Sequence, residues 1–163
     1  MPDTGGVQVV PAFQGLYAPW WDGSARGTIV GLTLHSTRAH VVRATLESIA
    51  YLTRAVVGAL EADVGVELEA LRVDGGMTAN DLLMQLQADI LGRPVVRSRV
   101  RETTALGAAF AAGLGAGVWA SPADLRALVH PDRTFEPAWS ADRREEGWAT
   151  WQRAVERARG WEA

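Results

Sequence analysis

The chain has 163 residues, a formal net charge of -3, no Cys, and 48% hydrophobic and 21% charged residues. That length suits one compact domain, and the composition is that of a globular protein with a real core. The lack of Cys excludes disulfides, thiolate catalysis and thiolate zinc sites. All 16 basic residues are Arg, which excludes the Walker lysine and Schiff-base catalysis. A negative chain is also a poor candidate for nucleic-acid binding.

The sequence supports neither a signal peptide nor a membrane-spanning helix. The first six residues have no basic start and no apolar core, so we expect no signal peptide. Residues 103–123 carry no charge and contain a GxxxG spacing, which is typical of a membrane helix. Their larger apolar side chains, however, recur at every fourth position, and Ser121-Pro122 ends the run. We therefore expect a buried helix with a glycine-rich end, in a cytoplasmic protein without a membrane partner.

The first half of the chain predicts two strands and one long helix. Short strands are expected over residues 7–13 and 27–32, and the loop between them holds Trp20-Trp21, which we expect to serve packing. Ser36 or Thr37 can then cap a helix whose apolar positions follow the 3.6-residue period.

The second half predicts a further alternation of strands and helices. We expect strands at 68–73 and 93–97, and helices from Thr78 or Asn80 to Gly92, over 104–113, over 121–128 and from about 142 to 161, the last with Trp148, Trp151 and Val155 as its inner stripe. This alternation of strands and helices predicts an α/β domain with a mixed or parallel sheet.

The segment from Val73 to Asn80 is the strongest candidate for a binding site. A strand that leads through Gly75 and Gly76 onto a helix N-terminus leaves backbone N–H groups unpaired, and glycine lets a phosphate approach the main chain. The geometry fits a nucleotide, and Asn80, the single Asn of the chain, could read an adenine edge. The alternative is structural: the two glycines form a tight turn, and Thr78 or Asn80 caps the helix.

No catalytic base or metal ligand is assigned. Each of the four candidate carboxylates has an ordinary structural interpretation. Asp22 would be a turn residue, Asp74 a strand end, Asp81 part of a helix N-terminus, and Asp89 part of a solvated helix face. The histidines, His35, His40 and His130, do not have the spacing of a metal centre.

Several segments together resemble a known family. Residues 27–32, followed after seven residues by 40–47, resemble the second signature of the FGGY carbohydrate kinases. Further segments are similar to the glycerol kinase branch of that family: 10–16 with 18–21, 73–80 with 83–85, and 102–109. The resemblance covers almost the whole chain, and Asp74 and Asn80 favour glycerol over a five-carbon ketose.

The resemblance implies an actin-like, ribonuclease H-type ATPase fold with a mixed sheet flanked by helices, incomplete on its N-terminal side. Residues 1–163 would be part of the C-terminal, nucleotide-binding domain. ATP or ADP, with Mg²⁺, is the implied cofactor, and Gly76, Asn80 and Gly75 are the implied contacts. Asp74 is assigned no direct contact, and residues 105–109 are expected to pack closely behind the site.

The resemblance also implies what is missing. The family's proton-accepting aspartate lies in a Gly-Asp-Gln-Gln segment, and no Asp-Gln pair occurs here. We therefore expect the C-terminal part of a glycerol kinase-like enzyme, which transfers the γ-phosphoryl group of ATP to glycerol only when an N-terminal half completes it. The alternative is a non-catalytic nucleotide-binding or interaction module. A homo-oligomer is compatible with either.

Overall fold

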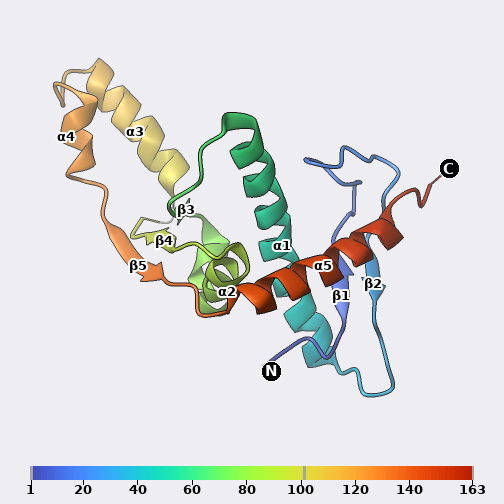
Figure 1. Cartoon of the computed structure of the whole chain (residues 1–163). Coiled ribbons are helices and arrows are strands. Elements are labelled where there is room, and N and C mark those ends of the chain that lie inside the picture. The colour runs from blue at the N-terminus through green and yellow to red at the C-terminus, as the bar shows by residue number, and fades with distance from the viewer. Residues whose placement is uncertain (1, 101, 163) are drawn as a thin grey trace.

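The computed structural model describes residues 2–100 and 102–162; residues 1, 101 and 163 of the expected domain lie outside the described residues. The elements follow one another as β1 (Gln8–Val10), β2 (Thr28–Val30), α1 (Arg38–Val64), β3 (Leu71–Val73), the 3-10 helix η1 (Gly76–Ala79), α2 (Asp81–Leu91), β4 (Val95–Ser98), α3 (Thr103–Gly115), α4 (Pro122–Arg126), β5 (Pro131–Phe135) and α5 (Ala141–Ala158). Figure 1 shows their arrangement. The class is mixed α/β, as the alternating pattern predicts.

The strands form two separate sheets. β1 and β2 pair antiparallel, while the larger sheet has the order β3-β4-β5, parallel between β3 and β4 and antiparallel between β4 and β5. The sequence analysis missed β5. This strand begins with Pro131, and its residues are exposed except Phe135, so it lacks the apolar alternation that marks a half-buried strand.

Helix α1 packs against α2, β1 and α5 and is the central element of the chain outside α3 and α4. Thr37 is its N-cap, one of the two residues expected, and the Thr37 backbone N–H donates to His40 Nδ1 at 3.0 Å. Gly65 ends the helix in the left-handed conformation at φ 71°, which costs glycine little. α1 contacts α2 and β1, and α5 contacts both α2 and β1, so the long helix joins the two sheets (Figure 1).

An aromatic cluster closes the core beneath α5. Trp151 is fully buried, stacks on Tyr51 at 5.5 Å between ring centroids, and donates from Nε1 to Val9 O at 3.0 Å. Trp20 meets Trp151 edge-on at 5.8 Å, as the expected packing role requires. Trp21 does not share it: this residue has a positive φ of 49° and is 76% exposed. The packing prediction is therefore wrong for Trp21.

A second cluster joins α2 to the three-stranded sheet. Leu83, Met84 and Ala88 pack against Val95 and Phe135. The same helix buries a carboxylate that the sequence analysis placed on a solvated face. Asp89 is 5% exposed, and its Oδ1 accepts hydrogen bonds from Gln85 Nε2 at 3.0 Å and from the Ala138 backbone N–H at 2.7 Å. These donors, which lie within α2 and beyond β5, compensate for the loss of water.

Helices α3 and α4 form an arm that stands away from the rest of the chain (Figure 1). No residue of either helix is buried. The main packing in the arm is internal: Phe110 meets Trp119 edge-on at 5.5 Å. The expectation of a buried helix, with close packing at residues 105–109, is wrong for this chain, because no other described element covers α3. None of the helices among the described residues is long and apolar enough to cross a membrane.

Candidate functional site

The turn after β3 has the backbone geometry that requires glycine. Gly75 has φ 88° and ψ 172°, a region that residues with a Cβ rarely adopt. A Cβ added at Gly75 or Gly76 would meet no other atom within 4 Å. Gly75 is thus fixed by its conformation, whereas Gly76 leaves the main chain open to an approaching group.

The chain does not enter α2 directly from the glycines. A 3-10 turn, η1, lies between them, and Gly75 O accepts from both the backbone N–H and the hydroxyl of Thr78, at 3.1 and 2.7 Å. The amides of Gly76 and Met77 have no acceptor within residues 2–100 and 102–162. Unpaired amides at such a turn can donate to a phosphate or another anion.

Asn80 caps helix α2, the structural role that the sequence left open, and its side-chain NH₂ group is still available to a ligand. It is the N-cap of α2, and its Oδ1 accepts from the Leu83 N–H at 3.2 Å. The residue is exposed, and its Nδ2 has no acceptor in the described part of the chain. Because an amide nitrogen carries two donors, Asn80 can still donate to a ligand while it caps the helix.

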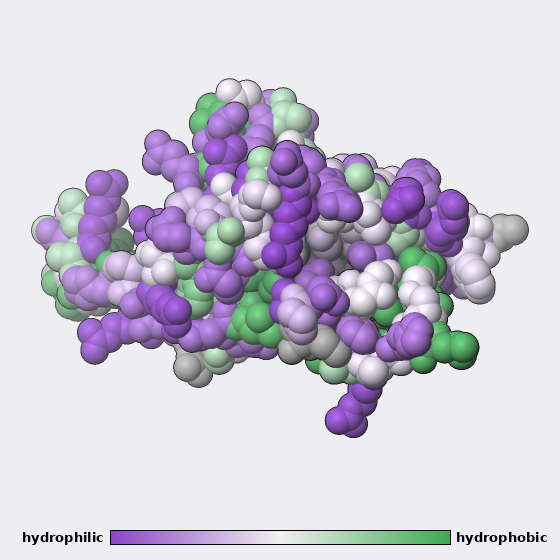
Figure 2. All heavy atoms as spheres, turned by 60° about the horizontal axis from the view of Figure 1, so that its bottom comes forward, coloured by the Kyte–Doolittle hydropathy of each residue, from purple (hydrophilic) through white to green (hydrophobic). Residues whose placement is uncertain are grey.

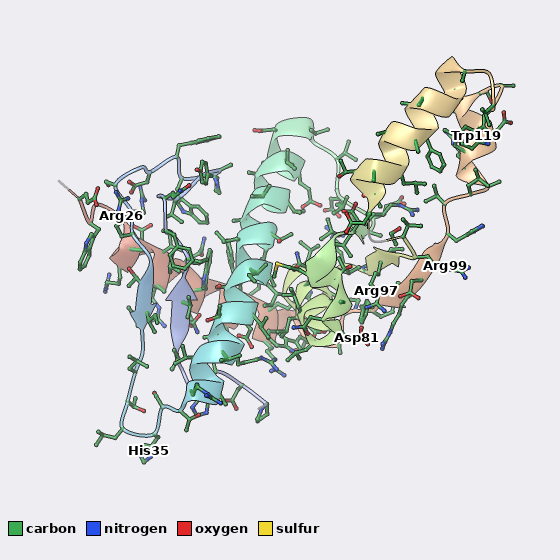
Figure 3. The ribbon with its side chains drawn as sticks, turned by 180° about the vertical axis from the view of Figure 1, so that it is seen from behind. Arg26, His35, Asp81, Arg97, Arg99 and Trp119 are labelled. Atoms are coloured by element: carbon green, nitrogen blue, oxygen red, sulfur yellow. The ribbon has the colours of Figure 1, made fainter. Side chains whose placement is uncertain are left out.

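An ion-pair network supports the far end of the turn, and the sequence analysis missed it. The Nη1 of Arg97 donates to Thr78 O at 2.9 Å and to Asp81 Oδ1 at 2.6 Å, and its Nε donates to Asp132 Oδ2 at 2.7 Å. Arg133 donates to the other oxygen of Asp81 at 2.8 Å. Figure 3 labels Asp81 and Arg97 side by side near the start of α2. The signal in the sequence was weak: an Arg on a strand and an Asp after a helix cap.

The network also sets the charge of its members. The hydrogen bond from Arg97 holds the pKa of the Asp81 carboxyl below its usual value, and the nearby charges of Arg97 and Arg133 act in the same direction. Hydrogen bonds to Asp81 and then to Asp132 raise the pKa of Arg97. Asp81 therefore remains an anion near neutral pH, held by its arginines, and is a poor proton acceptor.

A cavity of about 280 Å³ lies beside the turn, at the carboxyl ends of β3 and β4. Asp74, Arg97, Ser98 and His130 are among its lining residues. Open α/β sheets bind ligands at this end of their parallel strands. Asp74 is exposed and, within the described part of the chain, makes no hydrogen bond to Gly75 or Gly76, so it lies beside the turn without orienting it.

The other candidate groups do not converge on this turn. Asp22 Oδ1 accepts from the Ser24 and Ala25 amides, which confirms its interpretation as a turn residue. His40 is held by the N-cap of α1. Among the described residues, no group of three or more His, Asp or Glu side chains could hold a metal ion. What the structure brings together is Gly75, Gly76 and Asn80, on one short turn.

Comparison with known proteins gives one family. The model of the FGGY family of carbohydrate kinases, C-terminal domain, matches residues 1–116. A glycerol kinase of Symbiobacterium thermophilum is 60% identical over 163 residues, which is 100% of this chain and 33% of that protein. A glycerol kinase of Mycobacterium tuberculosis is 56% identical over 161 residues, 99% of this chain and 31% of that protein. The chain thus spans about a third of the length of the curated relatives it matches.

A solved structure extends the likeness to three dimensions. The crystal structure of Plasmodium falciparum glycerol kinase with ADP superposes with a TM-score of 0.88 at 41% sequence identity. The match covers 97% of this chain and 32% of that one.

Proposed function

The chain belongs to the FGGY family of carbohydrate kinases, and from this membership we propose that it supplies the nucleotide side of a glycerol kinase cleft. The reaction would be ATP-dependent phosphorylation of glycerol, ATP:glycerol 3-phosphotransfer, in the cytoplasm. The observation that carries the proposal is the likeness to a glycerol kinase solved with ADP, over 97% of this chain. Residues 1–163 would form one partial nucleotide-binding domain.

The contacts proposed for ATP or ADP come from the turn between β3 and α2. The unpaired amides of Gly76 and Met77 would donate to phosphate oxygens, and the Nδ2 of Asn80 would donate to the nucleotide. Gly75 gives the turn its shape through its positive φ. Phosphoryl transfer depends on such positioning and charge stabilisation more than on covalent chemistry by the protein.

Glycerol and the proton acceptor would come from the other two thirds of a full-length kinase. The carboxylates near the turn are unsuited to act as the base, because Asp81 is held by two arginines and Asp89 is buried. The described residues offer no carboxylate cluster for Mg²⁺. Mg²⁺ is usually held by one or two carboxylates together with substrate phosphates and water, and no step through the ion that the family resemblance implies is assigned to this chain.

The proposal is tested by titrating ADP into the isotopically labelled chain and following its amide signals by NMR. Localised shifts at residues 75–80 are expected. Asn80→Ser keeps an oxygen that can cap α2 and removes the amide donors. ADP should therefore bind about 5- to 150-fold more weakly, which corresponds to the loss of one or two hydrogen bonds at roughly 1 to 3 kcal/mol.

Gly76→Val should block the approach of phosphate sterically. Gly58→Val is its matched control, because a Cβ at Gly58 also meets nothing within 4 Å but the residue lies in α1. If saturating ADP shifts no signal at residues 75–80 in the folded wild-type chain, the proposed site is wrong.

A second candidate, a non-catalytic interaction module, is favoured by the exposed arm. α3 is rich in apolar residues and has no buried position, and exposed apolar surface promotes association with another protein or a second copy. An ATP-dependent glycerol phosphorylation assay separates the two candidates. The purified chain should be inactive alone, and the N-terminal part of a matching kinase should restore some turnover. Binding of ADP without any rescue would favour the module.

A further inference from the structure

We propose that Arg97 is a positioning residue for the nucleotide turn, an inference that rests on the proposed function. Arg97 lies on β4 and would not contact the nucleotide itself. Its side chain would act through Thr78 and Asp81, the residues on either side of Ala79 and Asn80. Without it, the amides of the turn would still exist but would no longer be held in one arrangement.

Arg97 is connected to both ends of the turn. In the parallel ladder between β3 and β4, Val73, the last residue of β3, is the register partner of Arg97. At the far end, the guanidinium donates to Thr78 O at 2.9 Å and to Asp81 Oδ1 at 2.6 Å. The backbone of Arg97 therefore fixes where the turn begins, and its side chain fixes where the turn ends.

The remaining donors of the same guanidinium anchor it to β5. Both Nε and Nη2 lie 2.7 Å from Asp132 Oδ2. The Arg97 side chain is only 15% exposed, so these bonds are partly shielded from water. The four-residue 3-10 helix η1 has few hydrogen bonds of its own. Arg97 therefore braces η1 against β4, which is paired on both sides.

The arrangement needs a guanidinium and not only a positive charge. Three acceptors on three different elements are reached at once: a backbone carbonyl of η1, a carboxylate of α2 and a carboxylate of β5. Arginine presents five donors in a rigid plane, whereas lysine has a single flexible ammonium group. Lysine at this position could keep one ion pair and would lose the bridge.

Arg133 provides a matched control in the same network. It donates to Asp81 Oδ2 at 2.8 Å and lies over the Phe135 ring at 4.5 Å, and its side chain is 54% exposed. It makes no hydrogen bond to the carbonyl of Thr78. Loss of Arg133 therefore removes a charge next to Asp81 and leaves the brace on the turn in place.

The experiment compares ADP affinity and backbone protection in four chains: wild type, Arg97→Gln, Arg97→Lys and Arg133→Gln. ADP should bind about tenfold more weakly to both Arg97 variants, a change that corresponds to 1.4 kcal/mol. Arg133→Gln should change the affinity less than about twofold. In the absence of ADP, hydrogen exchange at residues 78–80 should be faster in both Arg97 variants than in Arg133→Gln.

Each outcome bears on a different claim. If the wild type binds ADP at the turn and both Arg97 variants bind equally well, the positioning role is overturned and the nucleotide site stands. If Arg97→Lys binds like the wild type, the requirement for a guanidinium is wrong. If the wild type gives no shifts at residues 75–80, the proposed function fails, and the positioning role fails with it. Should Arg97→Gln not fold, Arg97→Lys, which keeps the charge, decides the same question.

Discussion

Helices α3 and α5 have opposite relations to the rest of the chain. α5 is strongly charged, yet it buries Trp151 and Val155 completely against the core and fixes Trp151 by a hydrogen bond to β1. α3 is almost entirely apolar, yet it has no buried residue. In Figure 2 hydrophobic residues are visible at the end of the molecule where the arm lies. Apolar composition creates the tendency to be buried, but burial requires a complementary surface, and of these two helices α5 alone packs against one.

The largest expected difference between the two regions concerns tryptophan. Trp151→Ala should lower the free energy of unfolding by about 3 to 5 kcal/mol, because it removes a fully buried ring. Trp119→Ala in the arm should cost about 1 kcal/mol, close to the worth of its single aromatic pair with Phe110. Chemical denaturation of the three proteins measures both values. An equal loss for the two variants would mean that the arm belongs to the cooperative core.

The loop between β1 and β2 offers the same comparison within two adjacent residues. Trp20 packs against the aromatic cluster, and Trp21 is 76% exposed. Trp20→Ala should reduce stability by roughly 1 to 3 kcal/mol, whereas Trp21→Ala should stay within about 0.5 kcal/mol of the wild type. Thermal melts of both variants test this. A larger loss for Trp21→Ala would show that its indole has a packing role that the exposed surface hides.

The smallest expected effects depend on pH and have opposite signs in the core and at the turn. Burial raises the pKa of Glu47 despite its ion pair with Arg43 at 2.7 Å. Relative to Glu47→Gln, the wild type should therefore be most stable below the unfolded pKa of about 4.3 and lose that advantage as the pH rises through the folded value.

Asp81 should behave in the opposite way. The bond from Arg97 lowers its pKa, so its contribution is present above the unfolded pKa of about 3.9 and is lost as the pH falls through the folded value. Denaturation of wild type, Glu47→Gln and Asp81→Asn from about pH 2 to about pH 7, a range that lies on both sides of the ordinary pKa values of Asp and Glu, measures both signs. Parallel curves for the two variants would contradict the contrast between a buried and a surface carboxylate.

Local patterns in the sequence determined a large part of this protein. Residues that cap or end helices, such as Thr37, Asn80 and Gly92, act through bonds to their own neighbours, so their roles could be predicted one segment at a time. The same holds for the glycine turn at 75–76. The motifs along the chain also identified the family, and the actin-like α/β fold class is confirmed by the likeness to solved kinases of that family.

Only the tertiary structure decided which surfaces find a partner. Trp20 and Trp21 are the same residue type in the same loop, and the fold partly buries Trp20 and leaves Trp21 exposed. Asp89 became a buried acceptor because the chain after β5 returns to α2 and presents the Ala138 amide. Arg97 reaches the turn between β3 and α2 because β4 lies beside β3 and β5, a pairing between segments that are distant in sequence. Such contacts depend on how separate elements meet in space, which the pattern of any one segment does not contain.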